Sequence, residues 1–333
     1  MSNRGKFGLV LAGGGAKGAF QAGALRHLAE IGFEPDVIAG NSIGSLNGAL
    51  LSNAGNLAEG ASKLDEVWTR LGEEDILTAD PNLLLQLPKL LKLASKEVVD
   101  GIQSFFKDLG LLNRSDHIFD PRPIENLVLE YIDFEKIKNG TEFWATVFPL
   151  AEHPEFSLFS FLRNLASIPG GKAKYYRIQD LTSYQDICNI ILASAAIPYL
   201  FPARDFKSSV LVDGGVADNT PVKALINAGC DLIVVIHLSF GTLWDRRSFP
   251  GQTIIEIKPH GPMTSKKLPM IKMMDALLDF SPEKIASLKK RGYQRAREVM
   301  TPLLNIGKDL DDLRRVSQQR DQLSQRLKDD PPL

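Results

Sequence analysis

A serine stands between two glycines where a short apolar run ends and a helix of small residues begins, in Gly40-Asn41-Ser42-Ile43-Gly44. The G-x-S-x-G spacing is typical of a nucleophile elbow, a strand-to-helix turn that strains the serine backbone and needs glycine on either side. The following helix directs its free N–H groups and the positive end of its dipole toward an oxyanion at the serine. The chemistry this pattern predicts is nucleophilic attack by Ser42 on an acyl carbonyl.

A glycine-rich loop, GGGAKG at 13–18, lies upstream between a buried strand predicted over 7–12 and a helix. A Walker A loop is excluded because Gly18 is followed by Ala19 instead of lysine. The loop does fit the dinucleotide pattern G-x-G-x-x-G, and Asp36 follows at about the right distance. However, Asp36 precedes the second strand, and the serine elbow occupies that strand's carboxyl end. A run of exposed backbone N–H groups beside a nucleophile favours an oxyanion hole.

Three later blocks extend this pattern: ASAAIPYLFP at 193–202, a strand that ends in Asp213-Gly214-Gly215, and NTP at 219–221. Together with GGGAKG and GNSIGS they make the chain resemble the patatin-like lipid acyl hydrolases. The resemblance covers about 10–55 and 190–240.

The resemblance implies that the aspartate of the D-G-G block is the base, so that Ser42 and Asp213 form a catalytic dyad. Ser42 would attack a fatty acyl ester of a lipid or phospholipid, and water would then hydrolyse the acyl-enzyme. The N–H groups expected to bind the oxyanion belong to Gly13, Gly14, Gly15 and Ala16. Lys17 is a candidate contact for the developing charge or a substrate phosphate, with a solvated lysine at the helix start as the alternative.

Other readings of the same residues stay open. A Ser-His-Asp triad would use His237 or His260 after Asp213, but α/β-hydrolases place several strands before the nucleophile, and here one βα unit precedes it. His237 also ends an apolar strand, where a core histidine is the usual finding. An acyltransferase of the malonyl transfer type has histidine before the serine, where this chain has Asn41. A non-enzymatic scaffold conflicts with the intact serine and aspartate.

The composition of the chain limits the classes of partner that it is expected to bind. The chain has 333 residues, 24% of them charged, and a net charge of -1, which gives no overall attraction to nucleic acid. Two cysteines in apolar segments indicate core residues, and we expect no metal and no cofactor. The apolar run near the N-terminus breaks at glycines after about five residues, too short for a signal peptide. We therefore expect a cytoplasmic protein, peripheral at the membrane when it meets lipid; the oligomeric state is left open.

Alternating apolar strands and helices predict an α/β fold, a three-layer α/β/α sandwich with a mainly parallel central sheet. We expect a catalytic domain over 1–305 with a helical insertion at about 56–140, followed by a charged helix or tail over 306–333. Three apolar segments are candidate lipid contacts, with packed core elements as the alternative: 82–94, 156–168 and 263–280.

Overall fold

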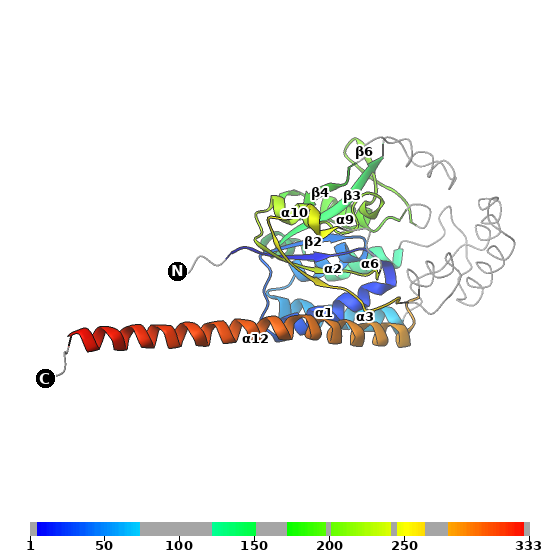
Figure 1. Ribbon diagram of the computed structural model, residues 1–333. Helices are drawn as coiled ribbons and strands as arrows, with labels where there is room; N and C mark the ends of the chain where they lie inside the picture. The colour runs from blue at the N-terminus through cyan, green and yellow to red at the C-terminus, as the bar shows by residue number, and fades with distance from the viewer. Residues whose placement is uncertain are drawn as a thin grey trace.

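A central β-sheet organises the molecule (Figure 1). The computed structural model describes residues 5–73, 122–150, 172–197, 201–240, 245–263 and 279–329. Within these ranges the sheet has eight strands in the order β5-β6-β3-β2-β1-β7-β8, and β4 also pairs with β3. The strands are β1 Phe7–Leu11, β2 Val37–Asn41, β3 Glu142–Leu150, β4 Lys174–Arg177, β5 Arg204–Phe206, β6 Ser209–Asp213, β7 Leu232–Ile236 and β8 Thr253–Ile257.

The sheet has a parallel half and an antiparallel margin. β1 pairs in parallel with β2 and β7, β2 with β3, and β7 with β8. β3 is antiparallel to both β4 and β6, and β5 is antiparallel to β6. The predicted α/β class with a mainly parallel sheet is confirmed.

Helices cover both faces of this sheet. Along β1, Leu9 and Leu11 join a core cluster shared with α1, α2, α3, α9 and α12, whereas Val10 joins a second cluster that includes α10. Successive strand residues point to opposite faces, so the two clusters lie on opposite sides and create three layers. The helices are α1 Gly18–Glu30, α2 Ile43–Ser52, α3 Leu57–Glu73, α6 Arg122–Tyr131, α7 Phe134–Asn139, α9 Tyr184–Ser194, α10 Val222–Asn227 and α12 Pro282–Asp329.

α12 packs tightly on α1 and then runs past the body of the protein (Figure 1). A Cβ atom added at Gly23 of α1 would lie 1.8 Å from the Lys289 carbonyl oxygen, and one at Gly292 would lie 1.9 Å from the Phe20 carbonyl oxygen. Glycine is therefore required on both helices for this approach. From Thr301 to Gly307 the side chains are exposed, and the helix crosses position 306 without a break. The predicted boundary between a catalytic domain over 1–305 and a tail over 306–333 stays a prediction.

Part of the predicted insertion is described. α3, α6 and α7 lie within 56–140 and are helical as expected, although the segment's status as an insertion stays a prediction. Of the candidate lipid contacts, 82–94 and 156–168 lie outside the described residues, as does 264–278. None of the helices in the described ranges is long and apolar enough to cross a bilayer.

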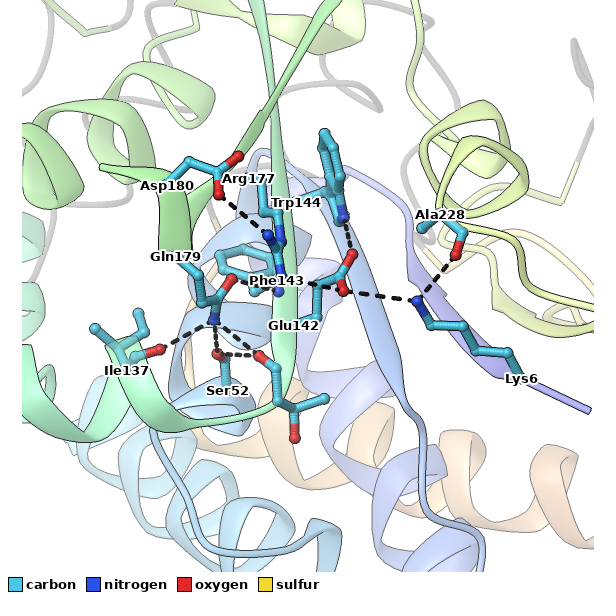
Figure 2. Close-up of polar contacts among 11 residues, drawn as sticks. Lys6, Ser52, Ile137, Glu142, Phe143, Trp144, Arg177, Gln179, Asp180 and Ala228 are labelled. Carbon is cyan, nitrogen blue, oxygen red and sulfur yellow. Dashed lines mark hydrogen bonds and ion pairs between the residues drawn. The ribbon is translucent and has the colours of Figure 1, made fainter. Parts of the chain in front are cut away.

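A polar network lies at the amino-terminal ends of the parallel strands, where β3 begins (Figure 2). We call this end of the strands the amino edge of the sheet, and the opposite end the carboxyl edge. The Gln179 amide nitrogen donates to the carbonyl oxygens of Ile137 and Thr141, both at 3.0 Å, and to the Ser52 hydroxyl at 3.3 Å. Its amide oxygen accepts the N–H of Phe143 at 3.0 Å. One partly buried amide thus joins α7 and the start of β3 to the end of α2. We call these five residues the amino-edge network.

Glu142 lies beside this network and joins β3 to β4 and to the segment before β1 (Figure 2). Its carboxylate pairs with Lys6 at 3.6 Å and with Arg177 at 3.4 Å, and accepts the indole N–H of Trp144 at 2.8 Å. Lys6 also donates, at 2.9 Å, to the carbonyl of Ala228, the residue that follows α10. The amino edge is therefore cross-linked by contacts between residues far apart in the sequence.

Candidate active site

Ser42 occupies the turn between β2 and α2 in a strained conformation, with φ 55° and ψ -127°. Two glycines make the turn sterically possible. A Cβ atom at Gly40 would lie 2.3 Å from the Gly44 carbonyl oxygen, and one at Gly44 would lie 2.1 Å from the Leu11 carbonyl oxygen. The Ser42 N–H donates to the Ser194 hydroxyl at 3.1 Å, at the end of α9. The backbone therefore has the strand-to-helix geometry that the G-x-S-x-G pattern predicted.

The length of β3 places Asp213 beside this turn. β3 has nine residues and continues past the carboxyl end of β2, so β6 can pair with the extra length and run back toward the elbow. In register, Asn41 lies opposite Thr146, and Asp213 lies opposite the next residue, Val147. At Gly214 a Cβ atom would lie 2.6 Å from the Thr146 methyl group, so only glycine lets the chain pass this close.

Asp213 is a buried carboxylate beside the elbow. It accepts the Asn41 amide N–H at 3.1 Å and the Gly215 backbone N–H at 2.7 Å, and it lies close enough to the Ser42 side chain for that group to affect its pKa. Burial raises the pKa of Asp213 from 3.8 to about 6, and the interactions with Ser42, Gly215 and Asn41 partly oppose that rise. A carboxylate that titrates near the working pH is well matched to take a proton from a serine hydroxyl.

Two asparagines connect the aspartate to the glycine loop. The Asn41 amide nitrogen, which bonds Asp213, also donates to the Asn219 side-chain oxygen at 3.0 Å. Asn219 in turn donates to the Gly13 carbonyl at 3.2 Å and accepts the Gly13 N–H at its own carbonyl at 3.3 Å. Neither asparagine was predicted as a site residue. The available signals were an amide directly before the nucleophile and the asparagine of the N-x-P block.

The glycine loop lies against Ser42. A Cβ atom at Gly13 would lie 3.0 Å from the Ser42 Cβ atom. The Gly13 N–H is already donated to Asn219, whereas none of the hydrogen bonds found among the described residues uses the N–H of Gly14. Gly15 has φ 57°, a conformation that favours glycine, and begins the short 3-10 turn that leads into α1. The loop thus presents backbone beside the nucleophile, and the Gly13 N–H already has a partner in Asn219.

Lys17 lies at the end of this loop. Its Cε atom would be 3.0 Å from a Cβ atom at Gly14, so the aliphatic stem packs along the loop backbone. Burial lowers the pKa of Lys17 from 10.5 to about 8. The ammonium group is still mostly protonated at neutral pH and supplies positive charge close to the glycine loop.

The two histidines proposed for a triad contact other carboxylates. The His237 ring nitrogen lies 2.9 Å from Glu256 on β8, and burial lowers the pKa of His237 to about 4. His260 is exposed and contacts Glu298 on α12 at 2.5 Å. The groups that set the pKa of Asp213 are Ser42, Gly215 and Asn41, with no histidine among them. The geometry favours the dyad over the triad.

The acidic residue of the dinucleotide pattern lies away from the glycine loop. Asp36 lies at the amino end of β2, where its carboxylate accepts the Phe7 N–H at 2.7 Å. That position is at the edge of the sheet away from the glycine loop, so Asp36 cannot bind a ribose on a nucleotide held by the loop.

In the part of the chain that the structure describes, no group of three or more His, Cys, Asp or Glu side chains is arranged to hold a metal ion. Both cysteines, Cys188 and Cys230, are free and buried.

Comparison with known families decides the relationship. The family model described as patatin-like phospholipase matches residues 9–226, which include the elbow, the glycine loop and Asp213. The chain belongs to this family. The predicted resemblance is confirmed.

Curated relatives in this family are much longer than the chain. Patatin-like phospholipase domain-containing protein 7 of Rattus norvegicus is 26% identical over 231 residues, which is 69% of this chain and 13% of the relative. Lysophospholipase NTE1 of Cryptococcus neoformans is 26% identical over 70% of this chain and 11% of its own length. Neuropathy target esterase sws of Drosophila melanogaster is 26% identical over 69% of this chain and 13% of its own length.

Solved structures with a similar chain path include two proteins of low sequence identity. VipD from Legionella pneumophila has a TM-score of 0.43 and 15% identity, over 90% of this chain and 67% of VipD. Human GIVD cytosolic phospholipase A2 has a TM-score of 0.42 and 12% identity, over 88% of this chain and 57% of that protein.

Proposed function

We propose that the protein is a serine lipid acyl hydrolase that cleaves fatty acyl esters through a dyad of Ser42 and Asp213. The observation that carries the proposal is the placement of the buried Asp213 carboxylate beside the strained Ser42, where Asn41, the residue before the serine, donates to Asp213. Membership of the patatin-like phospholipase family supports a lipid ester as substrate. The names of the relatives, a lysophospholipase and an esterase, favour phospholipids and lysophospholipids as the first substrates to test.

In the proposed first half-reaction, Asp213 accepts the Ser42 proton as the serine oxygen attacks the ester carbonyl carbon. The carbonyl oxygen becomes an oxyanion that accepts hydrogen bonds from the N–H groups of Gly14 and Gly15, with Ala16 beside them. Collapse of this intermediate breaks the ester C–O bond, and the departing alcohol takes the proton from Asp213. Ser42 is left as an acyl ester.

In the second half-reaction, water attacks the acyl-enzyme and Asp213 takes the water proton. The same N–H groups stabilise the second oxyanion. Collapse returns the proton to the Ser42 oxygen and releases a fatty acid. Lys17 adds positive charge beside the loop during both steps, and the same ammonium group is suited to contact a substrate phosphate.

A lipid substrate implies contact with a lipid surface. We propose peripheral contact with membranes, in keeping with the cytoplasmic location expected from the sequence. Co-sedimentation with phosphatidylcholine vesicles, compared between Ser42→Ala and the unmodified protein, measures this contact without turnover. Binding of both proteins to the vesicles is expected, and no binding by either would remove the peripheral part of the proposal.

The function is tested by ester hydrolysis in four single variants. We expect Ser42→Ala and Asp213→Asn to lose at least about 1,000-fold in kcat, because each removes one half of the reacting pair. His237→Ala and His260→Ala should keep their activity if they fold. A panel of phospholipid, lysophospholipid and neutral-lipid esters then identifies the substrate. Loss of activity in a folded histidine variant would support the triad, and full activity in Ser42→Ala would exclude the proposed nucleophile.

A further inference from the structure

Three buried polar side chains lie behind the glycine loop, one from each of the helices α1, α2 and α3. Gln21 and Trp68 are fully buried, and Asn47 is 2% exposed. The Gln21 amide nitrogen donates to the Ala12 carbonyl at 2.8 Å. The Asn47 amide nitrogen donates to the Gln21 amide oxygen at 2.8 Å and to the Gly18 carbonyl at 3.3 Å. The Trp68 indole N–H donates to the Asn47 amide oxygen at 3.0 Å.

These contacts hold both ends of the loop. Ala12 is the residue before Gly13, and Gly18 is the last residue of GGGAKG. The network binds carbonyl oxygens at both positions, and its hydrogen bonds use none of the N–H groups of Gly14, Gly15 or Ala16. Asn47 also belongs to α2, the helix that begins directly after Ser42. The network therefore joins the glycine loop to the helix that follows the nucleophile.

The orientation of the Asn47 amide is fixed from the third helix. Because the Trp68 indole is only a donor, it must face the amide oxygen, and the amide nitrogen is then directed at Gln21 and Gly18. A buried polar group is expensive unless it is hydrogen-bonded, and here each amide has partners for both its nitrogen and its oxygen. Such a network fixes one arrangement of the backbone more narrowly than apolar packing would.

We propose that Gln21 and Asn47 are positioning residues for the oxyanion hole, and that Trp68 acts on the loop through Asn47. The inference rests on the proposed function, since it assigns these side chains to the geometry of the same site. A hole formed by backbone N–H groups is effective only when they are held in place before the oxyanion forms. The network therefore supports kcat, and it does not touch the groups that set the pKa of Asp213.

The test compares apolar substitutions that remove the hydrogen bonds of each side chain: one for Trp68, two for Gln21 and three for Asn47. Gln21→Met, Asn47→Leu and Trp68→Phe are assayed on a soluble short-chain p-nitrophenyl ester, with urea unfolding of each variant. Gln179→Met is the matched control, because Gln179 is a bridging glutamine of similar bonding at the opposite edge of the sheet (Figure 2). The pH dependence of kcat/KM is recorded for all four variants.

We expect Gln21→Met and Asn47→Leu to lower kcat about 10- to 100-fold, with KM within about twofold, because they disturb oxyanion donors and leave substrate binding largely intact. Trp68→Phe should lower kcat about threefold to tenfold, since it removes the single hydrogen bond to Asn47 while a six-membered aromatic ring stays in place. The acid limb of the pH profile should stay in place. Gln179→Met should lose stability and keep kcat.

Three results would overturn the inference: unchanged kcat in all the folded network variants, an equal loss of kcat in Gln179→Met, or a shifted acid limb. If the first two variants do not fold, Trp68→Phe decides the question, because an unchanged kcat there removes the role of the network. Failure of the proposed function looks different. In that case Ser42→Ala would hydrolyse the ester, or a fluorophosphonate would fail to label Ser42 in the unmodified protein.

Discussion

The two edges of the sheet use polar side chains in opposite ways. At the amino edge, Gln179 uses both its amide nitrogen and its amide oxygen to join three segments of backbone. At the carboxyl edge, Ser42 is strained, Asp213 is a buried carboxylate, and the Asn41 side-chain oxygen has no hydrogen-bond partner among the described residues. The first arrangement stabilises the fold, and the second reduces its stability for the sake of reactivity.

This contrast predicts that substitutions at the two edges change the free energy of unfolding in opposite directions. Removing a satisfied amide from the amino edge should weaken the protein. Removing strain or charge from the carboxyl edge should strengthen the protein and abolish its chemistry. Such trade-offs between stability and activity are common at catalytic sites.

The largest expected effect on stability is at Asp213. Its pKa is raised in the folded state, so the protonated form favours folding below the unfolded pKa of 3.8 and this contribution is lost as the pH rises through about 6. At pH 8 the buried charge opposes folding by up to about 3 kcal/mol. Asp213→Asn should therefore be more stable than the unmodified protein at pH 8, with the difference shrinking toward pH 4. Urea unfolding at several pH values measures it, and a less stable variant at pH 8 would contradict the contrast.

Gln179→Leu should act in the other direction. The substitution removes the Gln179 amide from the Phe143 N–H and the Ile137 carbonyl, while the Thr141 carbonyl keeps the Ser52 hydroxyl, at a cost of about 2 kcal/mol. The same urea measurement records the loss, while kcat per folded molecule should not change. A fall in kcat without a fall in stability would show that the amino edge takes part in the chemistry.

Asn41→Ala should shift the pH profile. The Asn41 amide lowers the pKa of Asp213, so its removal should move the acid limb of kcat/KM upward by about one pH unit. Asn41→Asp is unsuitable because it adds a second buried charge beside Asp213. A profile that keeps its midpoint while activity falls would assign Asn41 to packing alone.

The smallest expected effect on stability is at Ser42. Both Ser42→Ala and Ser42→Gly remove the nucleophile, but only glycine relieves the positive φ, by about 1 kcal/mol. Ser42→Gly should therefore be the more stable of the two inactive variants in urea unfolding. Equal stability would mean that the elbow is not strained in solution.

Much of the fold could be predicted from the sequence because apolar runs, glycines and turns have local patterns. The elbow geometry at Ser42 and the strand that ends at Asp213 are present as expected. The direction of β6 could not be predicted, since an apolar run does not specify whether its neighbour is parallel. The contacts of Asn41 with Asn219 and of Gln21 with Asn47 join residues that no local pattern connects. The catalytic roles themselves stay predictions.

The central claim is that Asp213 activates Ser42, and labelling by a fluorophosphonate tests it most directly. The rate of labelling should rise as the pH passes through about 6, the titration of Asp213, with the label on Ser42. In Asp213→Asn the rate should be at least about 100-fold lower above pH 7, with the difference shrinking below about pH 6, and in His237→Ala it should be unchanged. Equal labelling rates in Asp213→Asn and the unmodified protein would contradict the dyad.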